Sequence, residues 1–180
     1  MEPNFEQSIN LSLKWIKEWE KGELSEEILA DRIFELIKYF NGARAFLVAA
    51  LTSDGPLLDR LPEQLLLKFN LAGESFIDLI VKNLAMSSAM TEYHKQNNDI
   101  QKMNKSDQIS FRCIELMRNL DTSMVKRSAD SLRDGLKGIG QYAVFLEKNG
   151  YKEYQKVGIK KKLFLIAKEK GANAPSKGTD

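Results

Sequence analysis

Residues that build metal and redox sites are scarce in this 180-residue chain, which has one cysteine and one histidine. With Cys113 alone, neither an intrachain disulfide nor a cysteine-based zinc site can form. With His94 alone, bis-histidine haem ligation is excluded, and Thr91 stands where a di-iron bundle would need glutamate. Glycine-rich dinucleotide motifs, the phosphate-binding P-loop and the His-Glu-x-x-His zinc motif are missing too. The sequence therefore supports neither a cofactor nor an enzymatic activity.

Long apolar runs are also missing. The longest, residues 45–51, is far too short to span a bilayer, and the richer stretch 76–90 is interrupted by Asp78 and Lys82. The first residues, MEPNFEQ, carry acids where a signal peptide carries lysine or arginine. These features predict a cytoplasmic protein without integral membrane association, and the lone thiol fits a reducing compartment.

Proline and glycine are sparse enough to predict the fold class. Neither occurs between Glu74 and Asp134, an interval rich in Leu, Met, Ala, Lys, Glu and Gln, which favours helix over strand. We predict an all-α multi-helix bundle of about six to seven helices, including two or three long central helices. It forms a single domain over residues 1–170, followed by a disordered C-terminal tail at 171–180.

Local signals place the helices along the chain. A first helix at 4–21 is stopped by Gly22, and a second begins after Ser25 and stops at Asn41-Gly42. The apolar run that follows favours a short buried helix, with a strand as the alternative, because periodicity alone cannot separate the two. Further helices are predicted at 62–70, 74–96, 106–120, 125–149 and 152–170.

Apolar residues from Val125 to Leu146 recur at spacings of four and three, which is typical of a heptad seam. The seam is short, so a helix of an intramolecular bundle is favoured over a dimerising coiled coil. Gly135, Gly138 and Gly140 interrupt it, and a glycine inside a helix costs about 1 kcal/mol relative to alanine. Packing, a hinge and a ligand all remain open as reasons for these glycines.

Met86, Met90 and His94 are spaced four apart and stack on one face of helix 74–96. A soft-metal site is one interpretation of this face. The same face continues through Phe76 and Leu79, however, and buried methionines commonly fill irregular gaps. We therefore predict a core stripe rather than a metal site.

Three segments, GARAFLVAALTSDGP, VKNLAMSSAMTEYHKQN and FLEKNGYKEYQ, resemble a group of uncharacterised cyanobacterial proteins, over about two-thirds of the chain. The resemblance implies a bacterial cytoplasmic protein and carries over no activity and no site residue. Arg44, Asn83 and His94 are the polar residues in these segments that are worth testing, and a structural role is expected for them.

Positive charge is concentrated at the C-terminal end, where eight lysines face three acids from Tyr151 onward. Lys156, Lys160, Lys161 and Lys162 form a candidate basic patch. Successive lysines point in different directions around a helix, and no arginine accompanies them. These features favour lysines that are simply solvated over lysines that bind nucleic acid or a membrane surface. Nucleic-acid association through this helix remains an alternative.

The apolar residues of helix 4–21 fill an arc of roughly 200°, about twice a minimum core stripe. We predict an interface formed by Leu11, Trp15 and Trp19. The favoured interpretation is a small cytosolic, non-enzymatic protein that acts by protein interaction or regulation. Its partner is another protein, and a second copy of the chain in a homodimer is one such partner. A further alternative is a helical bundle that encloses an apolar ligand or pigment in a cavity lined by Met86, Met90 and Phe76.

Overall fold

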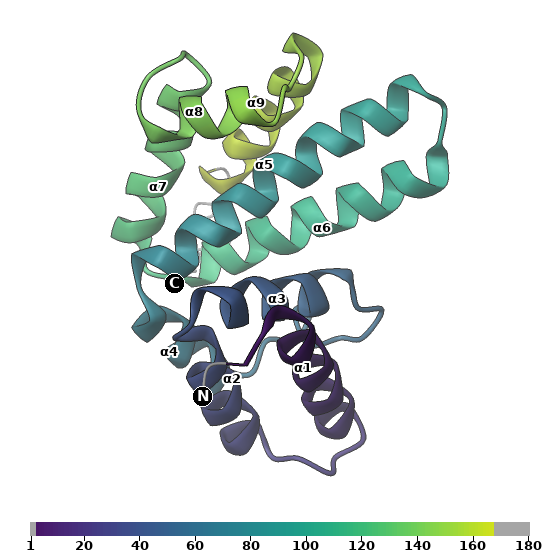
Figure 1. Ribbon diagram of the computed structural model, residues 1–180, viewed down its shortest axis with the longest axis vertical. Coiled ribbons are helices and arrows are strands. Elements are labelled where there is room, and N and C mark those ends of the chain that lie inside the picture. The colour runs from purple at the N-terminus through teal and green to yellow at the C-terminus, as the bar shows by residue number, and fades with distance from the viewer. Residues whose placement is uncertain (1–2, 168–180) are drawn as a thin grey trace, which may run out of the picture.

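The computed structural model describes residues 3–167. Within these residues the chain forms nine α-helices and no strand (Figure 1). The all-α prediction is confirmed, whereas the predicted number of six to seven helices is wrong. The predicted tail at 171–180 and the end of the last predicted helix lie outside the described residues.

The N-terminal helices are α1 (Phe5–Glu20), α2 (Glu26–Ile37), α3 (Phe40–Thr52) and α4 (Glu63–Ala72). Asn4 begins α1 with a capping box, in which its side chain accepts from the Gln7 amide at 2.9 Å and the Gln7 side chain accepts from the Asn4 amide at 3.1 Å. Ser25 caps α2 as predicted, accepting from the Ile28 amide at 3.3 Å.

The predicted stop at Asn41-Gly42 is wrong, because α2 ends at Ile37 and both residues lie in the first turn of α3. A Cβ atom on Gly42 would lie 2.1 Å from the Leu36 carbonyl oxygen. The glycine therefore permits the close approach of α3 to the end of α2 instead of ending a helix. As a result Phe40 begins a new helix at a corner of the chain.

The C-terminal helices are α5 (Glu74–Gln96), α6 (Ile100–Asn119), α7 (Thr122–Gly135), α8 (Gln141–Lys148) and α9 (Glu153–Ala167). The bounds of α5 agree with the prediction. The predicted start of α6 at Ser106 is wrong, because Asp99 caps the helix by accepting from the Lys102 amide at 3.1 Å.

A single helix over 125–149 is also wrong, because the chain turns between α7 and α8. Gly138 and Gly140 have φ angles of 86° and 78°, values that only glycine adopts without cost. Gly135 has another role, since a Cβ there would lie 2.5 Å from the Cβ of Tyr142 on α8. A turn, which was not among the three reasons left open by the sequence, thus accounts for two of the glycines, and close packing, which was, accounts for Gly135.

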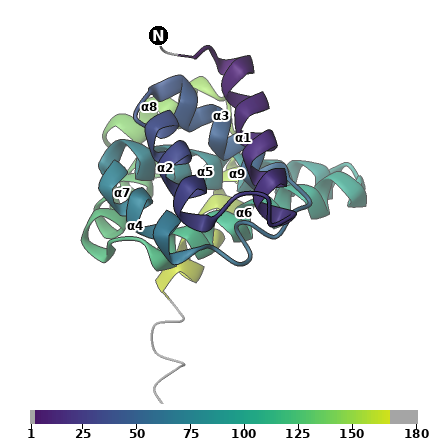
Figure 2. The same ribbon diagram turned by 90° about the horizontal axis from the view of Figure 1, so that it is seen from below.

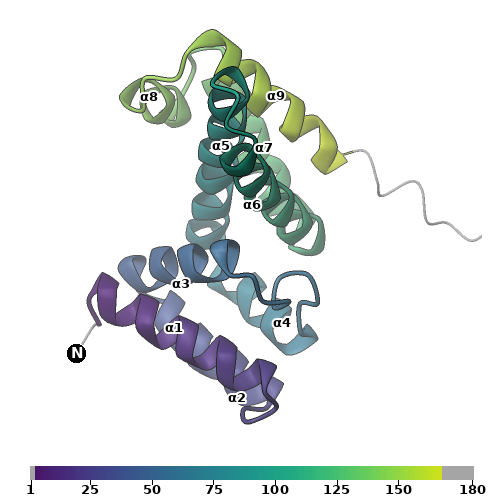
Figure 3. The same ribbon diagram turned by 90° about the vertical axis from the view of Figure 1, so that its right-hand side faces the viewer.

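The helices form two groups, with α1–α4 at one end of the molecule and α5–α9 at the other (Figures 1 and 3). The antiparallel pair α5 and α6 is the centre of the second group, and α5 also packs against α9, α7, α3 and α4. Seen from below, α1 lies at the edge of the first group (Figure 2). Tilted aromatic rings join the groups: the centroids of Phe46 and Phe69 are 5.6 Å apart, and those of Phe69 and Phe76 are 4.9 Å apart.

Small side chains allow α5 and α6 to approach closely. Ser110 on α6 donates to the Ser87 hydroxyl on α5 at 3.0 Å, and the Ser88 hydroxyl lies 3.5 Å from that of Ser110. The face of α5 that carries these serines is buried, whereas the methionine face is buried at Phe76 and Leu79 and exposed farther along the helix. Met86 and Met90 are 42% and 37% exposed, so the predicted core stripe is wrong at both methionines.

Candidate functional site

The predicted interface residues Leu11, Trp15 and Trp19 are half-buried, and both tryptophans pack against the core. The guanidinium carbon of Arg32 on α2 lies 5.8 Å from the centroid of the Trp15 ring. Helix α1 packs mainly against α3 and to a lesser extent against α2. Two neighbours thus share its wide apolar arc, and the interface at these three residues stays a prediction.

The four lysines of the predicted basic patch do not share one solvent-facing surface. Lys162 points toward α6, where its ammonium lies 2.7 Å from an Asp107 carboxylate oxygen and 3.7 Å from the centroid of the Phe111 ring. Lys156 pairs with Glu153 at 2.8 Å. Lys160 and Lys161 are exposed. Because Lys162 is held against α6, it does not belong to a common patch with the other lysines.

Arg44, Asn83 and His94 each contact different neighbours. Arg44 lies over the rings of Phe5 and Phe40, at 5.3 and 5.6 Å from the ring centroids. The Asn83 amide donates to a backbone carbonyl one turn earlier at 2.8 Å. The His94 ring is half-buried, with its centroid 5.4 Å from that of the neighbouring Tyr93 ring. These contacts fit the structural role expected of all three.

The most buried cation, Arg112 on α6, was not singled out from the sequence. It binds the loop between α3 and α4: Nη1 donates to the carbonyls of Leu51 at 3.0 Å and Ser53 at 2.5 Å, and Nη2 to that of Gly55 at 3.2 Å. Nε and Nη2 also donate to the two Asp59 carboxylate oxygens, at 3.2 and 3.0 Å. These five hydrogen bonds engage all five N–H donors of the guanidinium, which therefore links the two groups of helices.

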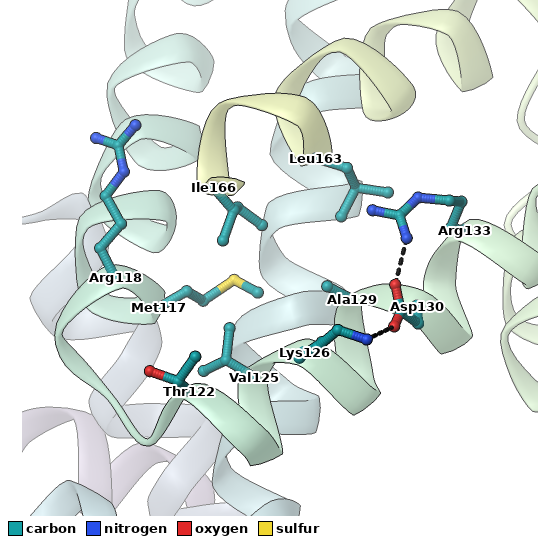
Figure 4. A pocket seen from close by; sticks show the side chains of 10 residues that line it. All are labelled: Met117, Arg118, Thr122, Val125, Lys126, Ala129, Asp130, Arg133, Leu163 and Ile166. Carbon is teal, nitrogen blue, oxygen red and sulfur yellow. Dashed lines mark hydrogen bonds and ion pairs between the residues drawn. The ribbon is translucent and has the colours of Figure 1, made fainter. Parts of the chain in front are cut away.

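A pocket of about 440 Å³ lies between α6, α7 and α9 (Figure 4). We call it the α6–α9 pocket. Its apolar floor comes from all three helices, and charged or hydroxyl side chains surround its mouth. The floor consists of Met117, Val125, Ala129, Leu163 and Ile166, and the mouth of Arg118, Thr122, Lys126, Asp130 and Arg133.

Charges at the mouth are ordered by one carboxylate. Asp130 accepts from Lys126 at 3.1 Å and from Arg133. The hydrogen bond from Lys126 lowers the pKa of Asp130 from its ordinary value, with a further contribution from Arg133. Arg118 donates to the Leu165 carbonyl of α9 at 2.6 Å and to Glu115. The apolar pocket drawn in Figure 4 is lined by other residues than Met86, Met90 and Phe76, and a ligand cavity at those three stays a prediction.

A second feature is an exposed apolar surface where α2, α3, α4 and α5 meet. Leu71, Phe40 and Leu67 are 70%, 63% and 52% exposed. Phe40 and Leu71 line a hollow of about 390 Å³ whose other walls include Phe34 and Phe76. We call this region the Phe40–Leu71 surface. The sequence pattern predicts Phe40 at the end of the second helix, whereas in the structure it is the first residue of α3, at the corner after α2, and its ring is exposed to solvent.

Two further observations concern the part of the chain that the structure describes. Residues 3–167 contain no group of three or more His, Cys, Asp or Glu side chains that could hold a metal ion. None of the helices there combines the length and the apolar character needed to cross a bilayer.

Taken together, these features define an all-helical protein with an exposed apolar surface and a cation-rimmed apolar pocket. Over residues 4–165 the chain matches the family described as Uncharacterised conserved protein UCP020893, so it belongs to that family. No curated protein and no solved structure gives a match. The resemblance to an uncharacterised group is thereby confirmed, and its cyanobacterial origin stays a prediction.

Proposed function

We propose that this chain is a non-enzymatic interaction protein that self-associates through the Phe40–Leu71 surface. The observation that carries the proposal is the exposure of Phe40 and Leu71, which both line an apolar hollow. Single exposed apolar side chains are ordinary, but contiguous ones mark interaction sites. Here the surface is contiguous, because Leu71 also lines a neighbouring hollow with Leu67 and Met124.

A second copy of the chain is the partner that this surface fits best. In a twofold interface the same patch meets itself, so it must offer both a projecting group and a recess. Leu71 and Phe40 project beside the hollow that the corresponding side chains of a second copy can enter.

The rim of this surface is likewise complementary to itself. It carries both charge signs, with Lys38 paired to Glu35 and Lys68 to Asp31 at 2.8 Å. The ammonium groups of both lysines also lie over the Phe34 ring, at 4.8 and 5.3 Å from its centroid. In a twofold contact each rim lysine can therefore face a carboxylate of the other copy.

Size-exclusion chromatography with light scattering tests this proposal through Leu71→Asp. Burying one leucine contributes about 1.5–3 kcal/mol, and a twofold interface contains it twice, so the substitution should raise the dimer dissociation constant at least about 100-fold. Leu13→Asp is the matched control, since Leu13 is 44% exposed on α1. Circular dichroism checks that each variant is folded.

A wild-type protein that stays monomeric at high concentration would refute the proposal. Leu11→Asp separates it from the interface predicted on α1. If Leu11→Asp dissociates the dimer and Leu71→Asp does not, self-association occurs through α1 and the Phe40–Leu71 surface is not the interface.

A further inference from the structure

Four of the five side chains that form the floor of the α6–α9 pocket are almost fully withdrawn from water, and the fifth, Ile166, is half-buried. Met117 is 1% exposed, Leu163 3%, Val125 5% and Ala129 7%, yet all four line the hollow of about 440 Å³. Atoms that line a void lack packing partners on one side. A hydrocarbon group that entered the pocket would supply those partners, and the volume lies in the range of about 300–1,000 Å³ that is typical of ligand pockets.

The mouth of the pocket carries more positive than negative charge. Lys126 and Arg133 both donate to the single carboxylate of Asp130, and Arg118, which is itself paired with Glu115, lines the pocket from α6 (Figure 4). A lysine has three donor hydrogens and an arginine five, so one carboxylate uses only part of what Lys126 and Arg133 offer. The trio of Lys126, Asp130 and Arg133 has a net charge of +1, which a second carboxylate would neutralise.

We propose that the α6–α9 pocket binds an amphipathic carboxylate, with its alkyl chain on the apolar floor and its head group at Lys126 and Arg133. The apolar floor binds the alkyl chain, and the cationic mouth binds the carboxylate of the same molecule. A neutral chain of the same length would fill the floor and leave the cations without an additional partner. An amine would bring a like charge to the mouth.

Isothermal titration calorimetry with four probes tests the site on the full chain. Decanoate, kept below its micelle concentration, carries both parts of the ligand. Decanol has only the chain, acetate has only the head group, and decylamine has a head group of opposite charge. We expect decanoate to bind about fivefold more tightly than decanol, the upper end of what an exposed ion pair contributes, decylamine to bind more weakly than decanol, and acetate to show no binding.

Three results would overturn the proposal. They are an absence of decanoate binding, equal affinities for decanol and decanoate, and binding of decylamine as tight as that of decanoate.

Substitutions at the mouth then assign binding to this pocket. Lys126→Ala should weaken decanoate binding about fivefold. Lys137→Ala is the matched control, because Lys137 pairs with Asp134 at 2.9 Å just beyond α7 and does not line the pocket. Asp130→Asn should strengthen decanoate binding, since it removes the carboxylate that competes for the same donors.

A fourth variant addresses the floor. Ala129→Phe fills the pocket and should abolish binding of decanoate and decanol alike. If this variant does not fold, Lys126→Ala and Asp130→Asn still decide the matter. Equal losses in Lys126→Ala and Lys137→Ala, or weaker binding in Asp130→Asn, would place any bound decanoate elsewhere on the molecule and refute the proposal.

Discussion

Replacing Arg112 with leucine tests how the loop between α3 and α4 is held against α6. The Arg112 side chain is 5% exposed and donates to the carbonyls of Leu51, Ser53 and Gly55 as well as to Asp59. Leucine keeps an apolar side chain at this position and removes every donor. The three carbonyls would then lose a charged partner in a place where water has little access.

The expected loss follows from the partners that are left behind. Leaving a buried acceptor without its donor costs about 1–3 kcal/mol, so the loss of the donor to three carbonyls in a partly hydrated loop should cost about 3–5 kcal/mol in all. For a protein of this size each kcal/mol lowers the Tm by about 2–4 °C, so Arg112→Leu should lower it by about 6–20 °C. Urea denaturation followed by circular dichroism measures the free energy of unfolding, and calorimetry measures the Tm.

Asp59→Asn is the matched control, because the Asp59 side chain is 54% exposed. An exposed ion pair contributes at most about 1 kcal/mol, and asparagine keeps one acceptor oxygen, so this variant should stay close to wild type. If the free energy of unfolding of Arg112→Leu lies within about 1 kcal/mol of the wild-type value, water replaces the guanidinium without penalty and the expectation is wrong. If Asp59→Asn lowers the free energy of unfolding as much as Arg112→Leu does, then the ion pair, and not the carbonyl contacts, holds the loop.

Two further predictions concern the turn after α7 and the core. Gly138→Ala should lower the free energy of unfolding, measured by urea denaturation, by about 1 kcal/mol, because the φ of 86° at this position disfavours a side chain. Gly135→Ala should cost more, because its Cβ would lie 2.5 Å from that of Tyr142; the reverse order would contradict the two roles assigned to these glycines. Burial raises the pKa of the Cys113 thiol, so the thiolate stays unpopulated at about pH 8 and a disulfide reagent should react only after unfolding. Rapid labelling of the folded protein would show that Cys113 is accessible.

Capping chemistry and the absence of Gly and Pro predicted some helices well. Ser25 marks the start of α2, and the uninterrupted stretch after Gly73 gives α5 its bounds. The first turns of α6 escaped prediction because they are polar and show no apolar period, although Asp99 is a good N-cap. The turn between α7 and α8 was hidden by the heptad spacing, which continues in the sequence across Gly138 and Gly140.

Which face of α5 is buried depends on tertiary contacts and could not be predicted from the apolar pattern of its sequence. Apolar residues occupy most of the circumference of this helix, so periodicity could not tell which face is buried. The small residues Ser87 and Ser88 decide it, since they permit the close approach of α6 and leave the methionine face outside.

The candidate sites depend even more on tertiary contacts. The α6–α9 pocket arises where Leu163 and Ile166 of α9 pack opposite α6 and α7, which are distant in sequence. The exposure of Phe40 follows from a chain corner that the sequence presents as a helix stop.

The outward position of Met86 and Met90 bears on how the protein withstands oxidative chemistry. Conversion of a thioether to a sulfoxide makes the side chain polar, which disrupts a packed interior. On α5 both sulfur-bearing side chains are partly in solvent, so peroxide can modify them while the Ser87–Ser110 contact between the central helices stays intact. The longest helix of the fold thus carries its oxidisable groups where their damage is least costly.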